Sequence, residues 1–204
     1  MKANLLHLKR LSLVFIAIPV IALLFLSLND GTEPRLNKKM DRLIKKMWKE
    51  TKVERTPFLV PPNLKPGEFT EIFSLTVNKE LIGYMILNKA YSCKVGGCSA
   101  WSPVEDQSNY EPFYYVVIIN PDLTINKIKI IEYYSEYGYE ITGKRWLAQF
   151  MGKTGCNLEY QKQIDGISGA TISVKSMIYD INNTCKMMKQ LDLMNLLSYN
   201  GAHK

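Results

Sequence analysis

The chain has 204 residues, enough for one domain with attached segments. Its apolar fraction of 47% is typical of a globular protein, and its net charge is +7 from 26 basic and 19 acidic residues. This charge could suit nucleic acid, but much of the excess lies in the first half, around an apolar segment. A membrane explains that pattern better, and we expect no nucleic-acid partner.

The apolar segment covers residues 11–28 and carries no charge. As a helix it would be about 27 Å long, close to the bilayer core of roughly 30 Å. Basic residues Lys2, Lys9 and Arg10 lie in the preceding residues 1–10, and positive flanks stay in the cytoplasm. We therefore expect a single-pass anchor in the inner (cell) membrane. The N-terminus would be cytoplasmic and the domain extracytoplasmic, on the periplasmic or exterior side.

A cleaved signal peptide is the alternative for this segment. Its apolar region would be shorter, about 7–15 residues, and would end in a small-x-small cleavage site. The sequence Ser27-Leu28-Asn29 is a poor site of that kind, and no lipobox cysteine follows. An uncleaved anchor is favoured, although the basic cluster at residues 38–52 on its far side weakens the charge asymmetry that sets orientation.

Residues 29–67 form a juxtamembrane region. Between Leu36 and Val53, apolar residues fall at helical spacing among lysines and arginines, which predicts an amphipathic helix. The helix either lies on anionic lipid or packs its Met/Trp stripe on the domain; the second is favoured, and the two can coexist. Residues 56–67 contain four prolines and are predicted to be a linker or an irregular approach to the domain.

Strand-like segments follow. Residues 71–77 and 81–88 form one predicted hairpin, and residues 113–120 and 125–134 form a second. Two successive hairpins indicate an antiparallel sheet. Partial alternation of isoleucine and lysine in residues 125–134 predicts that one face of this strand is exposed to solvent.

Helices are predicted at residues 142–150 and from Val174 to about Leu197. The fold class is therefore α+β, with a transmembrane helix before an antiparallel-sheet domain flanked by helices. We place the domain at residues 68–190 and a C-terminal tail at residues 191–204.

Four cysteines are present. Cys93 and Cys98 bracket a short loop with two glycines, and a structural disulfide is favoured there over a redox-active pair or a metal-ligand role. Cys156 and Cys185 could be buried thiols or a second bridge, and the sequence leaves both open.

The most informative motif is DGISGATIS at residues 165–173. Thr171 offers an aliphatic hydroxyl, and its small neighbours Gly169 and Ala170 leave room for the active site of another enzyme. Backbone N–H groups in a glycine-bearing turn before a helix can hold phosphate oxygens. Ser168 and Ser173 could cap that helix or contact the phosphate. The plain alternative is a simple helix cap.

The motif resembles the signature at which FMN is attached covalently to a hydroxyl side chain. The signature occurs in flavin subunits of the sodium-pumping NADH:quinone reductase and the Rnf complex, and in related FMN-binding-domain proteins. The resemblance implies FMN bound through a phosphoester to Thr171. It also implies that Asp165 is a recognition handle, or a metal ligand, for the flavin transferase that installs the cofactor.

The resemblance extends over residues 68–188. A glycine-bearing strand at residues 82–86, a Glu/Gly loop at residues 135–140 and a short helix ending near Gln149-Phe150 have counterparts in the family. The loop departs from the Glu-Thr-Pro-Gly pattern of the respiratory subunits, so the chain is not assigned to those complexes.

Several residues near this loop are candidates to contact the flavin. The resemblance places Gly138 and Glu140 beside the ring, with Tyr137, Tyr139 and Trp146 to stack on it or flank it, unless these are ordinary core or surface aromatics. Lys144 and Arg145 could offset the negative charge of flavin or phosphate, or simply be solvated.

The sequence contains no recognisable nucleophile–base pair, metal-ligand cluster or Gly-rich nucleotide loop after a strand. We therefore expect an electron-transfer component rather than a stand-alone enzyme, working with unidentified redox partner proteins. Two alternatives remain open: a non-redox anchored binding module, and a flavin-dependent reductase that acts on a small substrate.

Overall fold

A computed structural model describes residues 33–65, 69–94, 102–103 and 107–199. The predicted anchor at residues 11–28 lies outside these ranges, as does Cys98. Among the described residues, no helix is both long and apolar enough to cross a bilayer. The chain divides into two compact units, residues 1–37 and 38–204, and the fold below is that of the second.

The unit is built on one antiparallel sheet, which confirms the predicted α+β class. Its five strands are neighbours in chain order: β1 (Glu54–Phe58), β2 (Glu71–Val77), β3 (Glu80–Cys93), β4 (Tyr110–Ile119) and β5 (Ile125–Glu132). The turn between β2 and β3 has Asn78 and Lys79 at positive φ, 51° and 71°, as a two-residue hairpin requires.

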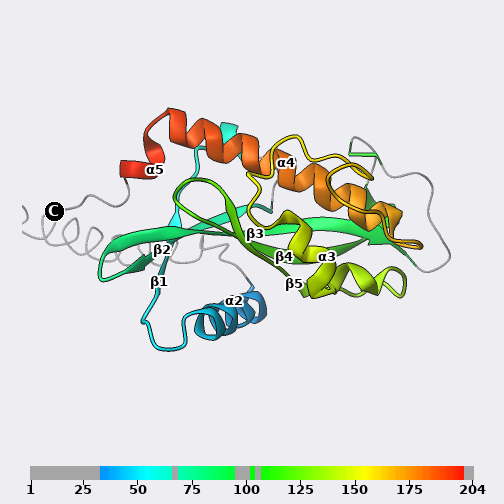
Figure 1. The fold of residues 1–204 in the computed structure, drawn as a ribbon, viewed down its shortest axis with the longest axis horizontal. Helices are drawn as coiled ribbons and strands as arrows, with labels where there is room; N and C mark the ends of the chain where they lie inside the picture. Colours follow the sequence, from blue (N-terminus) through cyan, green and yellow to red (C-terminus); the bar gives the residue numbers. More distant parts are fainter. Residues whose placement is uncertain (1–32, 66–68, 95–101, 104–106, 200–204) are drawn as a thin grey trace, which may run out of the picture. The chain divides into compact units, whose positions relative to one another are not determined.

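Helices cover both faces of the sheet (Figure 1). One face carries α4 (Thr171–Leu193), and the other carries the part of α2 (Pro34–Met47) from Lys38 onward. The segment between β5 and α4 contains α3 (Lys144–Leu147) between the 3₁₀ turns η3 (Tyr139–Thr142) and η4 (Ala148–Phe150). The remaining short elements are η1 (Pro62–Leu64), η2 (Gln107–Asn109) and α5 (Leu196–Tyr199).

Alternate residues of the central strands fill two apolar layers. Tyr84 and Ile86 of β3 belong to the core beneath α4, whereas Met85 and Leu87 are buried on the opposite face. The expectation of one solvent-facing side was made for β5, and it holds in part: Asn126 is exposed, and Lys127 and Lys129 are partly exposed.

Helix α2 buries Met40 and Ile44 while Lys45 and Lys46 remain exposed. The packing interpretation of this amphipathic helix is thus confirmed. The helix ends at Met47, several residues before the predicted end, and an edge strand follows it.

Residues 56–58 of that edge strand, β1, belong to the segment for which four prolines predict a linker or an irregular approach to the domain. Pro57 is tolerated because, among the described strands, β1 pairs only with β2, so one side of the strand needs no N–H donor. Strand β3 also runs five residues past its predicted end at Asn88. Asn88 is fully buried and donates to Thr184 Oγ1 of α4 at 2.9 Å; this tertiary bond outweighs the low strand propensity of asparagine.

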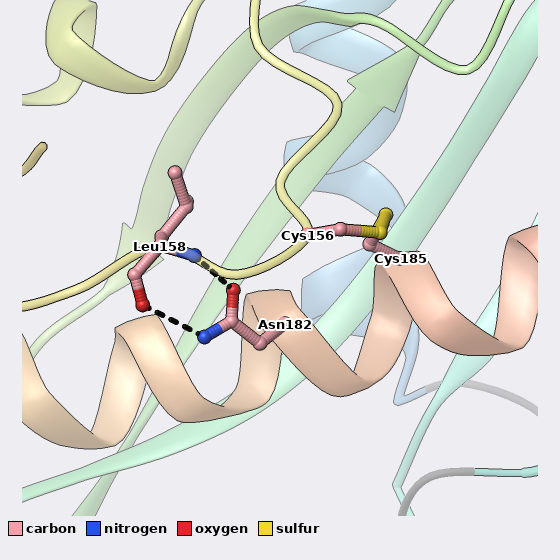
Figure 2. The surroundings of a disulfide bond; sticks show 4 residues. All are labelled: Cys156, Leu158, Asn182 and Cys185. Atoms are coloured by element: carbon pink, nitrogen blue, oxygen red, sulfur yellow. Dashed lines mark hydrogen bonds between the residues drawn. A yellow bond between two sulfur atoms is a disulfide. The ribbon is translucent and has the colours of Figure 1, made fainter.

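A disulfide joins Cys156 to Cys185 of α4, with the two Cα atoms 5.4 Å apart. Nearby, the Asn182 side chain accepts from the Leu158 N–H at 2.8 Å and donates to the Leu158 carbonyl at 2.9 Å (Figure 2). The segment that leads into the predicted flavin motif is therefore fixed to α4 at two points. Cys93 is also disulfide-bonded.

Candidate functional site

Thr171 is the first residue of α4, and the motif before it forms a tight turn. The Ala170 N–H donates to the Ile167 carbonyl at 3.0 Å, and Gly169 has φ +77°. A glycine is suited to this position because positive φ is unfavourable for residues with a Cβ. The helix therefore begins three residues earlier than predicted, directly at the candidate attachment residue.

The tip of the turn is open. Ser168, Gly169 and Thr171 are exposed, and a Cβ built on Gly169 would meet nothing within 4 Å. The Thr171 hydroxyl group thus lies on a part of the surface that another protein can approach.

Neither Ser168 nor Ser173 caps the helix, which is one of the two roles expected of them from the sequence. The N-cap residue is Ala170, which has no side-chain hydrogen bond to offer. Ser173 is only 2% exposed and its Oγ lies 3.1 Å from the Tyr133 hydroxyl group. Ser168, in contrast, is exposed one residue before the glycine, outside the helix.

The start of α4 is suited to an anion. The first backbone bond of the helix runs from the Val174 N–H to the Ala170 carbonyl at 3.0 Å. The N–H groups before Val174 have no carbonyl partner within the helix, and the helix dipole adds partial positive charge there. A phosphate on the first residue of the helix would lie in this favourable field.

The Glu/Gly loop contacts the motif directly. Gly138 has φ +69°, and a Cβ there would lie 2.4 Å from the Ala170 Cβ. Tyr133, which follows β5, donates its hydroxyl hydrogen to the Tyr137 carbonyl at 2.6 Å. The Ser173 hydroxyl is therefore the donor in its bond to Tyr133. Burial raises the pKa of Tyr133, so its hydroxyl hydrogen stays in place at neutral pH.

Tyr133 was not among the sequence-predicted site residues, because its bond to Ser173 joins positions 40 residues apart. Its place at the end of a predicted strand, two residues before the loop, was the only available signal.

The backbone of Asp165 is held on both sides by the short helical segment before it. Trp146 Nε1 donates to the Asp165 carbonyl at 2.9 Å, and the Asp165 N–H donates to Gln149 Oε1 at 2.9 Å. Asp165 itself is exposed. This arrangement suits a residue that another protein must recognise.

Trp146 lies in the core rather than on the surface. It is 8% exposed, and its ring centroid is 5.3 Å from that of Phe150. Trp146 is therefore a core aromatic that holds Asp165, as the alternative in the sequence analysis allows, and its contact with flavin stays a prediction. Tyr137 and Tyr139 are 46% and 67% exposed and keep open ring surfaces. Glu140, Lys144 and Arg145 are also exposed.

Tyr160 and Lys175 flank the motif on another side. Lys175 lies one helical turn after Thr171 and places its Nζ 5.3 Å from the centroid of the Tyr160 ring. A Cβ on Gly166 would come within 2.6 Å of the Tyr160 hydroxyl oxygen, so this tyrosine packs closely on the motif.

Together, the sheet, the turn before α4 and the Glu/Gly loop define an α+β domain that presents the Thr171 hydroxyl group at a helix N-terminus. Residues 110–186 match the family model described as FMN-binding domain, a range that covers β4, β5, the Glu/Gly loop, the motif and most of α4. This match identifies residues 110–186 as an FMN-binding domain, which indicates a flavin-binding protein. No curated protein matches the chain.

Proposed function

We propose that the chain is a membrane-anchored, extracytoplasmic electron-transfer flavoprotein with FMN bound through a phosphoester to Thr171. The observation that carries the proposal is the position of Thr171: exposed, first in α4, and next to the open Gly169 turn. These residues fit a phosphate ester, because the hydroxyl is accessible and the helix start favours negative charge.

Each part of the site has a role in attachment. The Thr171 Oγ would form the new bond to the phosphorus of an activated FMN donor and lose its proton. The bond from that phosphorus to the rest of the donor breaks at the same step, and this part leaves with the bonding electron pair into the transferase. Asp165, held by Trp146 and Gln149, is presented to that enzyme. Ser168 and Gly169 leave the approach open, and Ala170 anchors the turn against Gly138.

The flavin supplies one- and two-electron chemistry, and the protein positions it. Tyr137, Tyr139 and Glu140 are exposed on the loop that adjoins the motif, where they can border the ring. A covalent bond prevents loss of the cofactor outside the cytoplasm, and an anchor at residues 11–28 would keep the domain near membrane redox partners.

The proposal is tested by expressing the full chain with a flavin transferase and measuring in-gel flavin fluorescence after denaturing electrophoresis. Thr171→Ala should abolish the signal, and Thr171→Ser should retain part of it because a hydroxyl remains. Thr154→Ala, the same change at an exposed threonine outside the motif, is the matched control and should stay fluorescent.

Fluorescence in Thr171→Ala that survives denaturation would show that another residue is the acceptor. Absence of flavin in the parent chain, with the transferase active on a control protein, would favour the binding-module alternative.

A further inference from the structure

A groove of about 530 Å³ lies between α2 and β5. Its lining is rich in basic side chains from both elements: Lys39, Arg42 and Lys46 from α2, and Lys129 from β5. Tyr134 and Tyr139, which are 53% and 67% exposed, add aromatic surface to the same lining. We call this feature the basic groove.

The one carboxylate among the described lining residues is already neutralised. Glu132 is buried, with Oε1 2.8 Å from Lys39 Nζ, and its Oε2 accepts from the Tyr134 hydroxyl group at 2.7 Å. In the part of the chain that the structure describes, Arg42, Lys46 and Lys129 form no ion pair. The basic groove therefore carries three uncompensated positive charges.

Two tyrosines link the basic groove to the surroundings of the candidate flavin site. Tyr133 and Tyr139 both line the groove, with ring centroids 6.3 Å apart. The Tyr133 hydroxyl group bonds to Ser173, two residues after Thr171. The groove thus opens beside the loop that contacts the flavin motif.

We propose that the basic groove is the docking surface for the acidic face of the protein that exchanges electrons with the flavin. The inference rests on the proposed function, because it needs a redox-active flavin at Thr171. Opposite charge steers the encounter and fixes its orientation. Tyrosine is enriched at protein interfaces, and Tyr134 and Tyr139 are placed to be covered by the partner.

The test uses the full chain, loaded with flavin and chemically reduced. Its reoxidation is followed by stopped flow with two one-electron oxidants of opposite charge, ferricyanide and hexaammineruthenium(III). The groove variant is Arg42→Glu/Lys46→Glu. The matched control is Lys45→Glu/Lys49→Glu, which makes the same charge change at exposed positions of α2 and the segment after it, outside the basic groove.

At about 0.1 M ionic strength, where the screening length is about 10 Å, the groove variant should react about threefold more slowly with ferricyanide. It should react faster with the ruthenium ion, and the control should change less with both. A decaglutamate peptide serves as a probe that mimics an acidic protein surface. It should lower the rate of flavin reoxidation by ferricyanide in the parent and the control, but not in the groove variant.

Equal rate changes in the groove and control variants, or inhibition by decaglutamate that persists in the groove variant, would overturn the docking surface. Flavin content is measured first on every protein. A parent chain that acquires no flavin contradicts the proposed function instead, so the two failures are distinguishable.

Discussion

At the scale of single residues, the contact between Gly138 and Ala170 couples the Glu/Gly loop to the turn before α4. The two residues are 32 positions apart in sequence, yet a single added methyl group would overlap the Ala170 Cβ at 2.4 Å. Positive φ at Gly138 adds a backbone reason for glycine.

Gly138→Ala should therefore lower the free energy of unfolding by more than backbone strain alone, which costs roughly 1–2 kcal/mol. It should also reduce flavin attachment, because Ala170 must move. Gly152→Ala is the matched control: its φ is +75°, but a Cβ there would meet nothing within 4 Å. Urea unfolding and flavin fluorescence check both variants, and equal effects would show that the contact with Ala170 is unimportant.

The sequence predicted a turn followed by a helix at residues 165–173, although not the exact start of the helix, because this structure is local. Residues 165–173 act through their own backbone, and the exposed Thr171 and the open Gly169 are where the motif places them. The bond of Tyr133 to Ser173 and the bond of Trp146 to Asp165 could not be predicted, since each joins positions far apart in the sequence.

At the scale of elements, hydrophobic patterning predicted the four longer strands and the long helix, but not their limits. Proline and asparagine are both disfavoured in strands. For this reason the edge strand that contains Pro57 was not predicted, and β3 was predicted to end at Asn88. In both cases the deciding factor is position in the sheet or contact with α4, which a local pattern does not contain.

The interface between the sheet and α4 contains a polar cluster with a titratable group. Tyr115 of β4 donates to Asp180 of α4, and Asn88 Nδ2 donates to the Tyr115 oxygen at 3.3 Å. Burial raises the pKa of Asp180 to about 7 from its ordinary 3.8, while the bond from Tyr115 partly opposes this. Burial likewise raises the pKa of Tyr115 well above 10, so its hydroxyl stays protonated.

Because the folded protein holds the Asp180 proton more tightly than the unfolded chain does, the stability from this group is complete below about pH 4. It is lost as pH rises through about 7. Asp180→Asn should remove this dependence. Urea unfolding at pH 5 and pH 8 should show a larger loss of stability in the parent than in the variant. An equal loss in both would mean that Asp180 is already ionised at pH 5.

The disulfide between Cys156 and Cys185 stabilises the segment that carries the motif. It closes a loop with a sequence separation of 29, for which chain entropy gives about 3–4 kcal/mol. Cys156→Ala/Cys185→Ala should lower the free energy of unfolding by roughly that amount in a urea titration at neutral pH. A loss below about 1 kcal/mol would indicate that the Asn182 bonds to Leu158 and core packing already fix this segment.

At the scale of the whole molecule, the fold brings three features to one region: an exposed hydroxyl at the start of α4, a loop packed against it, and the basic groove beside that loop. The first two suit covalent attachment of a flavin, and the third suits a charged partner. An electron carrier needs both properties close together, because electrons must leave the cofactor for another protein.

The most direct test of this account is the intact mass of the full chain under denaturing conditions, after export into a compartment that contains a flavin transferase. We predict an increase equal to one FMN less one water, mapped by peptide fragmentation to Thr171. An unmodified mass, with the transferase shown to be active on a control protein, would contradict the account and leave the turn before α4 as a simple helix cap.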